Sequence, residues 1–545
     1  MSVRGRLASL GERIADDDAS AVGTGLTLLA AAIAAVLVLP LGWLLVDVFH
    51  LGGRALGLTV APTTVRVLLR SVALVAVVTG GSVLIGVPLA VLTVQAEIPF
   101  RRFWTVLAAL PLAIPSYLGA FAAVSAFGPR GVLADALAPL GVERLPTIYG
   151  FAGAALVLTL YTYPYVFLTT RASLLSLNAS LVEAARTLNA DRWEAFRRVT
   201  LPQITPGIAA GALLVALYTL SDFGTPNIMR VQVFTQFIYA RYNAFMRDYA
   251  ALLSLQLLAV TMVILSIESR IGVDERNAYA NRGSGGTVDL DLGAWRYPAI
   301  LLPAAVALAA IALPIAIFGM WLVRSGPGYG AGGMAFSWSY GWHSVYVSLL
   351  TAGAAVLVAL PIALRSAVSD SRLAALADRA PYVGYATPGI VLAIALVSFS
   401  LDVVPALYKT VPLLVFAYVV RFMPQAIGSI RTSTLQVDRR LVEAARTLGR
   451  GRLSAFRSVT LPLIAPGIAT GAALVFLTTM KELPTTLLLR PLRFDTLVTF
   501  IWRVQEAGLY GRAAVPALVL VAVSGLSMAV ILAQEGGRDH DDGAQ

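Results

Sequence analysis

The sequence predicts an all-α polytopic membrane protein, and three observations lead to this prediction. Hydrophobic residues make up 58% of the 545 residues and charged residues only 13%, with a mean hydropathy of +0.78. Soluble domains are usually nearer a quarter charged. Many apolar runs reach roughly 18 residues, enough to cross a hydrocarbon layer about 30 Å thick as a helix. Finally, one long segment occurs twice, which indicates two related sets of spans.

Twelve membrane spans are expected along the chain. Their approximate ranges are 23–46, 65–94, 103–127, 148–170, 204–223, 249–267, 297–323, 344–364, 380–401, 411–430, 464–483 and 511–533. Arginine is enriched in the loops that this threading places inside, as the positive-inside rule requires. We therefore expect a multi-pass protein of the cell (inner) membrane with both termini cytoplasmic, although one crossing could be a short re-entrant segment.

A charged, glycine-containing stretch at residues 268–296 divides the chain. Its composition is that of a solvated cytoplasmic linker. It separates an N-terminal repeat, residues 1–267, from a C-terminal repeat, residues 297–545, each with about six spans. Because six is even, both repeats enter the membrane from the same side. The repeats are therefore predicted to be parallel rather than inverted.

The duplicated segment lies between the fourth and fifth spans of each repeat. EAARTLNADRWEAFRRVTLPQITPGI begins at Glu183, and EAARTLGRGRLSAFRSVTLPLIAPGI begins at Glu443; 18 of their 26 positions are identical. The alanines favour a helix, and Gly449 suits the left-handed residue that ends one, with Asn189 as its counterpart. Pro202 and Pro462 suit the first turn of the next span.

Two interpretations of this segment remain open at this point. An interfacial amphipathic helix that anchors the bundle in anionic headgroups would explain the arginines and the apolar residues. It would not explain why the same detail recurs in both repeats while the surrounding spans differ. A partner with twofold symmetry would explain the recurrence, because two equivalent surfaces need two equivalent contacts.

The pattern Glu-Ala-Ala, three residues, Gly, nine residues, a β-branched residue, one residue and Leu-Pro resembles the EAA signature of ABC-importer permeases. The loops are 183–202 and 443–462, and the first departs from the signature at Asn189. The resemblance implies a type I importer permease fold, a coupling helix in each loop that sits in a groove of an ATPase dimer, and an external solute-binding protein. The residues implied in ATPase coupling are Glu183, Ala184, Ala185, Arg186, Asn189, Glu443, Ala444, Ala445, Arg446 and Gly449.

The chain offers no nucleotide-binding motif of its own. A P-loop needs a glycine-rich turn that ends in Lys-Ser/Thr, and the two lysines, Lys409 and Lys481, do not follow a glycine. Cysteine is absent and the three histidines are far apart, so we assign no metal site, no catalytic residue and no bound cofactor. ATP and Mg²⁺ would be used by a separate ATPase chain. The net charge of +11 is ascribed to cytoplasmic loops rather than to nucleic-acid binding.

Several stretches resemble the fused permeases of ferric iron importers. They are PLAIPSYLGAF at 111–121, GPRG at 128–131, IYGF at 148–151 and KELPTTLLLRPLRFDTLVTFIW at 481–502. Ferric iron is therefore the expected cargo. Thiamine, polyamine, sulfate and phosphonate remain alternatives because permeases for these share the loop. An ion-coupled secondary transporter is the main rival class, and a channel is a third.

Four polar residues are candidates for the substrate pathway: Asp222, Glu482, Lys481 and Arg421. Asp222 and Glu482 are repeat mates near the outer ends of the fifth and eleventh spans. They could face each other as hard oxygen ligands for a trivalent cation, or they could be solvated interfacial charges paired with Lys481 or Arg230. Arg421 is either buried and functional or extends to the inner surface.

Overall fold

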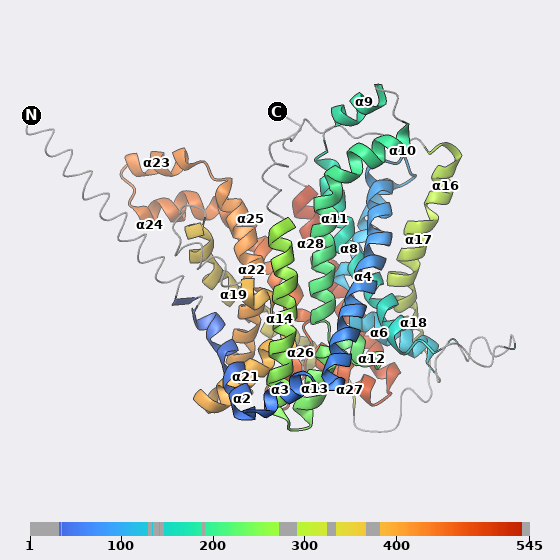
Figure 1. Cartoon of the computed structure of the whole chain (residues 1–545). Coiled ribbons are helices and arrows are strands. Elements are labelled where there is room, and N and C mark those ends of the chain that lie inside the picture. The colour runs from blue at the N-terminus through green and yellow to red at the C-terminus, as the bar shows by residue number, and fades with distance from the viewer. Residues whose placement is uncertain are drawn as a thin grey trace, which may run out of the picture. The chain divides into compact units, whose positions relative to one another are not determined.

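The computed structural model describes residues 32–33, 35–128, 133, 141, 147–177, 179–187, 191–271, 292–323, 334–366 and 382–536. In these ranges the chain forms α-helices joined by short 3₁₀ and π turns and loops, with no β-strand (Figure 1). The all-α prediction is confirmed.

Within the part of the chain that the structure describes, eight helices are long and apolar enough to cross a membrane. They are Pro62–Val94, Phe151–Leu175, Trp193–Ser221, Arg247–Ile267, Gly293–Val323, Trp338–Leu364, Val411–Leu435 and Leu453–Met480. Three shorter apolar helices, Ala35–Leu51, Gly389–Val403 and Tyr510–Leu526, lie at the predicted first, ninth and twelfth spans. Each of these segments falls where the sequence predicts a span. The linker, whose central residues are 272–291, lies largely outside the described residues.

The third predicted span, residues 103–127, is not straight. It consists of Arg101–Ala113 and Ser116–Phe127, which meet at an angle of 90°. Pro111 and Pro115 fall at the break, and Pro115 adopts an extended ψ of 134°. A proline ring clashes with the carbonyl four residues back and offers no N–H, so a helix cannot run straight through this sequence. Residues 103–127 therefore form a broken span or a re-entrant segment, and the sequence analysis left the second alternative open for one crossing.

The chain divides into two compact units, and neither is continuous in sequence. Unit 1 comprises Met1–Val46 and Gly341–Asp495; unit 2 comprises Asp47–Tyr340 and Thr496–Gln545. The units therefore do not follow the sequence repeats. In unit 2, the first helices of the second repeat pack on the first repeat, where the Tyr161 hydroxyl donates to the Ala310 carbonyl at 2.9 Å. In unit 1, Trp43 of the first repeat packs edge-on against Phe399 of the second, with ring centroids 5.0 Å apart.

Unit 2 carries the first repeated loop at one end, with α9 and α10 there and α3 and α13 at the opposite end (Figure 1). Its elements are α3 (Arg54–Thr59), α4 (Pro62–Val94), α5 (Arg101–Ala109), η2 (Leu110–Ala113), α6 (Ser116–Phe127), α8 (Phe151–Leu175), α9 (Ala179–Thr187), α10 (Arg192–Ala195), η4 (Phe196–Thr200), α11 (Leu201–Ser221), α12 (Gly224–Ile228), α13 (Phe234–Asn243), α14 (Arg247–Ile271), η6 (Gly293–Trp295), α16 (Arg296–Ala299), α17 (Leu301–Ala307), η7 (Leu308–Ala312), α18 (Leu313–Val323), α27 (Leu497–Glu506), η11 (Tyr510–Ala513) and α28 (Ala514–Gly536).

Unit 1 carries the second repeated loop at one end, with α23 and α24 there and α21 at the other end (Figure 1). Its elements are η1 (Leu39–Gly42), α19 (Trp338–Ser366, which begins three residues before the unit boundary), α21 (Gly389–Val403), η9 (Pro405–Leu407), α22 (Val411–Leu435), α23 (Arg439–Thr447), α24 (Arg452–Ala455), η10 (Phe456–Thr460), α25 (Leu461–Met480) and α26 (Pro484–Leu489). The unit boundary falls inside α2 (Trp43–Leu51).

Glycine pairs four residues apart allow close helix packing in both units. A Cβ on Gly207 of α11 would lie 2.0 Å from Ser173 Oγ of α8, and one on Gly211 would lie 2.6 Å from the Val166 Cα. Gly467 and Gly471 do the same for α25 against α22. Residues four apart share a helix face, and small residues there let two backbones approach closely. The two repeats therefore build the same helix pair.

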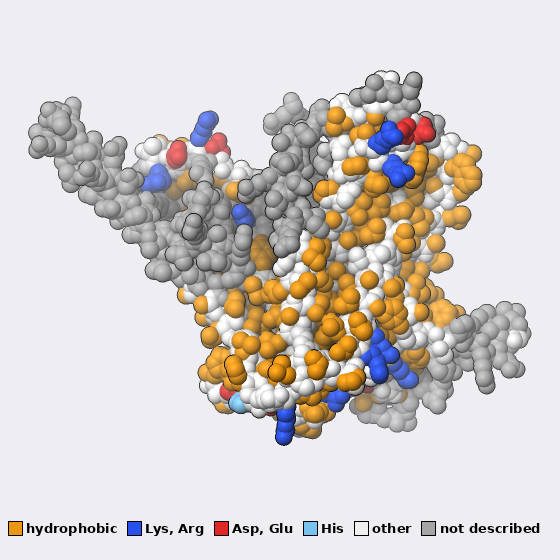
Figure 2. Space-filling view, viewed as in Figure 1, with side chains coloured by type: hydrophobic (Ala, Val, Ile, Leu, Met, Phe, Trp, Pro, Cys, Tyr) orange, Lys and Arg blue, Asp and Glu red, His pale blue; other side chains and the backbone are white. Residues whose placement is uncertain are grey.

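The helix sides are apolar and the charges gather at their ends. Figure 2 shows hydrophobic side chains over the middle of the visible helices and Lys, Arg, Asp and Glu side chains near the ends. On α4, for example, Leu69, Val77 and Leu84 are all exposed. Such a surface is unfavourable in water and favourable against lipid.

Candidate functional site

The second repeated loop and the residues before it, 436–460, include a short helix with well-defined ends. The Asp438 carboxylate accepts a hydrogen bond from the Arg440 N–H at 2.9 Å and caps α23. At the other end Gly449 has a φ of +84°. The N–H groups of Arg450 and Gly449 donate to the carbonyls of Ala445 and Arg446 at 3.2 and 3.0 Å. This is the Schellman arrangement, in which a left-handed glycine ends a helix, so the prediction for Gly449 is confirmed.

The motif residues of this loop divide between a buried and an exposed side of α23. Ala445 is buried, whereas Glu443, Ala444 and Arg446 are exposed. Two large apolar side chains next to them are also exposed, Leu441 and, at 84%, Leu448. The helix therefore buries an alanine on one side and exposes charged and apolar side chains on the other. Such an exposed surface is suited to binding a protein partner.

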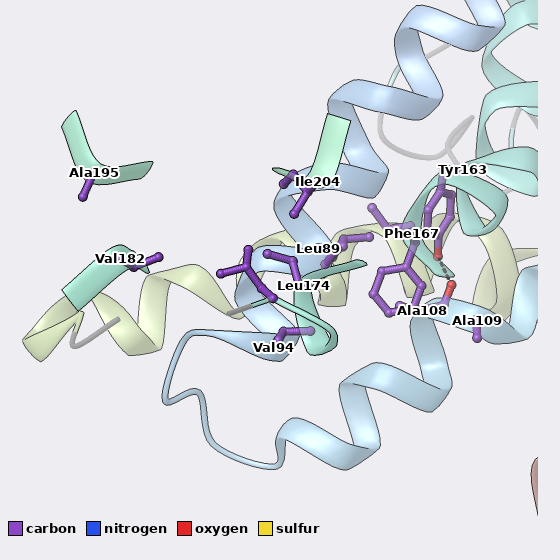
Figure 3. Close-up of a cluster of buried hydrophobic side chains, with 13 residues drawn as sticks. Leu89, Val94, Ala108, Ala109, Tyr163, Phe167, Leu174, Val182, Ala195 and Ile204 are labelled. Atoms are coloured by element: carbon purple, nitrogen blue, oxygen red, sulfur yellow. Dashed lines mark hydrogen bonds between the residues drawn. The ribbon is translucent and has the colours of Figure 1, made fainter. Parts of the chain in front are cut away.

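The first repeated loop and the residues before it, 176–200, are anchored in a hydrophobic cluster of unit 2. Val182 of α9 and Ala195 of α10 are buried with Leu174 at the end of α8, and Ala185 packs against the same cluster. Figure 3 shows Val182 and Ala195 at one side of the cluster and Tyr163 and Phe167 at the other. The loop is therefore attached to the ends of the spans, so a force on α9 would reach them.

Parts of this first loop cannot be compared with the second. The side chains of Glu183, Ala184 and Arg186 are not described, and Asn189 lies outside the described residues. The predicted roles of these four residues stay predictions.

Each loop continues into its span through a π turn. Residues 196–200 and 456–460 are π-helical, immediately before Pro202 and Pro462. Both prolines occupy the first turn of the following α-helix, as predicted. Because proline cannot donate to the ladder, the wider turn before it accommodates the missing bond without breaking the helix. The span helix therefore starts within the loop rather than at Leu-Pro.

Asp222 ends α11 and holds the short helix that follows. Its carboxylate accepts from the Thr225 N–H at 2.9 Å and from the Ser116 hydroxyl of α6. The Tyr218 hydroxyl donates to Ser116 Oγ at 3.1 Å. The partly buried Asp222 thus binds the first turn of α12 and also ties α11 to the bent third span.

Glu482 makes the equivalent contact with the first turn of α26 in unit 1, but its side chain is buried. It is 7% exposed, and its Oε1 accepts from Thr485 Oγ1 at 2.8 Å and from Arg421 Nη1 at 3.2 Å. A buried carboxylate needs such a charged partner. The solvated-charge interpretation of Glu482 and the extension of Arg421 to the inner surface were therefore both wrong. Lys481 is the C-cap residue of α25, and the cation that Glu482 binds is Arg421.

Gly389 leaves the space that this ion pair occupies, and the first repeat has serine at the equivalent position. A Cβ on Gly389, the first residue of α21, would lie 1.6 Å from Arg421 Nη1 and 2.6 Å from Glu482 Oε1. In the first repeat Ser116 occupies the equivalent place after its proline and binds Asp222 directly. Sequence reasoning missed this pair; the replacement of serine by glycine after Pro388 was the available signal.

In this structure the two acids are occupied by structural contacts. Both oxygens of Asp222 and Oε1 of Glu482 accept hydrogen bonds. Asp222 belongs to unit 2 and Glu482 to unit 1. That they face each other across a pathway and ligate a cation stays a prediction.

One further group of possible metal ligands lies at the opposite end of unit 2 from α9. Ligand atoms of Asp47, His50 and Asp248 lie within 4.8 Å of one another. Asp47 is ion-paired with Arg247 at 3.1 Å, and a guanidinium there opposes the binding of a second cation. Sequence reasoning did not group these residues because they lie on helices about 200 residues apart, and we assign no metal to them.

The sequence pattern of the family described as "Binding-protein-dependent transport system inner membrane component" matches the chain twice, at residues 82–271 and 355–535. The chain belongs to this family. It is a multi-pass inner-membrane permease subunit of an ABC importer, in which two permease repeats are fused in one polypeptide. Each match includes one of the repeated loops and the span that follows it.

Among its relatives, Fe(3+)-transport system permease protein FbpB 2 of Haemophilus influenzae is 30% identical over 507 residues, covering 92% of this chain and 96% of that protein. Ferric transport system permease protein FbpB of Actinobacillus pleuropneumoniae is 24% identical over 442 residues, covering 78% of this chain and 64% of that protein. Sulfate transport system permease protein CysT of Escherichia coli is 27% identical over 197 residues, or 34% of this chain and 70% of that protein.

Proposed function

We propose that this permease imports ferric iron, which an external solute-binding protein delivers and a separate ATPase dimer drives inward. The observation that supports ferric iron as the cargo is the similarity to FbpB 2 along nearly the whole of both chains. The sulfate permease relative aligns with only about a third of this chain, 34%. Ferric iron therefore ranks above sulfate, and thiamine, polyamine and phosphonate stay alternatives.

The coupling of this subunit to ATP hydrolysis is assigned to the repeated loops. The exposed side of α23, with Glu443, Arg446 and Leu448, is the proposed contact with one ATPase subunit. By repeat symmetry α9 contacts the other subunit. The π turns and the buried base of the first loop support this assignment, because they connect the loop rigidly to the spans. With this assignment we propose that the loops and both termini are cytoplasmic.

Transport by purified components tests the proposal. The permease would be reconstituted in liposomes with the ATPase that co-purifies with it and with its binding protein, and uptake of radioactive ferric iron would be measured. We expect uptake that requires ATP on the loop side and the binding protein on the other side. Excess unlabelled ferric iron should abolish it, while sulfate, thiamine and spermidine should not.

Two controls separate the rival classes. Ionophores that collapse ion gradients would leave an ATP-driven importer active but stop an ion-coupled carrier. Full-rate uptake without the binding protein would reject the proposed delivery route, and ATP-dependent uptake of another cargo would replace iron while leaving the coupling assignment intact.

A further inference from the structure

The turn between α13 and α14, at the end of unit 2 opposite α9, carries an exposed phenyl ring on a strained backbone (Figure 1). Phe245 has a φ of +59° and is 98% exposed. A left-handed backbone is unfavourable for an L-residue with a large side chain. Because the ring makes almost no contact with its own chain, packing within the chain does not offset this cost.

The hydrogen bonds of the turn show which residue type suits it. The N–H of Phe245 donates to the Tyr242 carbonyl, and the N–H of Met246 donates to the Arg241 carbonyl, both at 3.0 Å. This is the Schellman motif. The same two bonds end α23 and α27, where the left-handed residue is a glycine. Glycine has no Cβ and adopts this conformation without the steric cost, so the turn itself does not require phenylalanine.

The strain indicates a partner outside the chain, and its chemistry favours a protein over lipid. Strained residues concentrate at functional sites, and exposed aromatic rings are suited to anchoring a protein interface. An acyl chain is fluid and can pack on a ring in any direction, whereas a pocket on a folded protein needs the ring in one direction. Arg247, which begins the next spanning helix, is ion-paired with Asp47 at 3.1 Å. Charged groups therefore lie between Phe245 and the apolar part of that span.

We propose that Phe245 is an anchor for the external solute-binding protein and that its ring inserts into an apolar pocket on the surface of that protein. This inference rests on the proposed function, in which such a protein delivers the cargo to the end of the permease opposite the repeated loops. The left-handed turn holds the ring in place before contact, so less conformational freedom is lost on binding. Met246, which is 45% exposed, extends the apolar contact.

Stimulation of ATP hydrolysis tests the anchor in liposomes that hold the permease–ATPase complex. The measured quantity is the concentration of loaded binding protein that gives half-maximal stimulation. Phe245→Gly should raise it roughly 30-fold, a loss of about 2 kcal/mol that is typical of an aromatic anchor. The melting temperature should rise by about 2–4 °C, because the left-handed strain is relieved. A purely structural role of the ring would lower it instead. Phe245→Tyr keeps the ring and should behave like the wild type.

Phe100→Gly is the matched control. Phe100 has a φ of +58° and is 80% exposed, so the change relieves the same strain and removes the same ring. It lies at the loop-bearing end of unit 2, shortly after Val94, which belongs to the cluster that holds the first repeated loop. This variant should also melt at a higher temperature, but the half-maximal concentration of binding protein should not change.

A single label shows which partner covers the turn. The chain contains no cysteine, so Phe245→Cys can be labelled selectively with an environment-sensitive dye such as bimane. We expect its emission to shift to the blue only when the binding protein is added. Quenching by brominated lipids without the binding protein would show that lipid covers the turn. A shift that grows with permease density in the vesicles would show a second copy of the chain. Either result would overturn the proposal.

The hydrolysis measurement also separates this inference from the function on which it rests. If the binding protein stimulates the wild type and Phe245→Gly equally well at every concentration, the anchor is refuted and the delivery route stands. If the binding protein does not stimulate the wild type at all, the delivery route and the anchor are both refuted.

Discussion

Replacing Gly389 by alanine should break the buried ion pair of unit 1 without touching either of its members. The new methyl group would lie 1.6 Å from Arg421 Nη1, closer than any real contact, so the guanidinium must move. Arg421 and Glu482 have only 13% and 8% of their side-chain surfaces exposed. Neither charge can therefore be compensated by water where it stands.

The size of the effect follows from the pair's geometry. At the 3.2 Å separation of Arg421 Nη1 and Glu482 Oε1, the direct attraction is about 5 kcal/mol with an effective dielectric constant near 20. Leaving one buried charge unpaired typically costs about 3–5 kcal/mol. Alanine in a helix returns at most about 1 kcal/mol relative to glycine. We expect a net loss of roughly 3 kcal/mol, or about 6–12 °C in the melting temperature of a unit of this size.

The assay is thermal unfolding of the purified chain in detergent at one fixed heating rate, because unfolding of such proteins is often irreversible. Gly428→Ala in α22 is the matched control, since nothing lies within 4 Å of a Cβ there. It should melt at the wild-type temperature or slightly above. Gly389→Ala should also cost little in a background of Arg421→Ala with Glu482→Gln, where no ion pair remains to be displaced.

The reasoning would be refuted by either of two results. Gly389→Ala could melt together with Gly428→Ala, which would mean that the pair adjusts without loss. Alternatively, the penalty could persist in the background that lacks the pair, which would assign it to backbone packing around α21 instead.

Three further predictions concern the loops, the acids and the helix pairs. Glu443→Arg on the exposed side of α23 should uncouple ATP hydrolysis from uptake or reduce co-purification of the ATPase. The control Asp402→Arg, at the other end of unit 1, should not affect the ATPase contact. Normal coupling in Glu443→Arg would show that α23 is not part of the interface. If Asp222 and Glu482 act on one cation, the double variant Asp222→Asn, Glu482→Gln should reduce iron uptake per ATP hydrolysed by more than the product of the single effects. Independent effects, together with a lowered melting temperature for Glu482→Gln alone, would mean that both acids have a structural role only. Gly471→Leu should separate α25 from α22, because a Cβ at this position would lie only 2.9 Å from the Ala426 Cα. The yield of folded chain, measured by size-exclusion chromatography, should fall several-fold. An unchanged profile would contradict the close packing.

The sequence by itself determined the features that depend on near neighbours in the chain. Runs of apolar residues located the spans, because the membrane or the core selects them by length and composition. Gly449 ended α23 as expected, because only the local backbone conformation matters there. The spacing between the two loops and the absence of a P-loop were likewise visible in the sequence, and they led to the family that the similarity to known permeases then showed.

The tertiary structure alone decided the features that join distant segments. Nothing local to Arg421 indicates Glu482, 61 residues away, and the space that Gly389 leaves for them depends on how α21 packs against α22. The bend between Ala113 and Ser116, by contrast, has a local cause in Pro111 and Pro115, and it was missed because a hydropathy average passes over prolines. The first helices of each repeat pack on the other repeat because an apolar helix buries its face wherever a complementary surface lies, whatever its place in the chain.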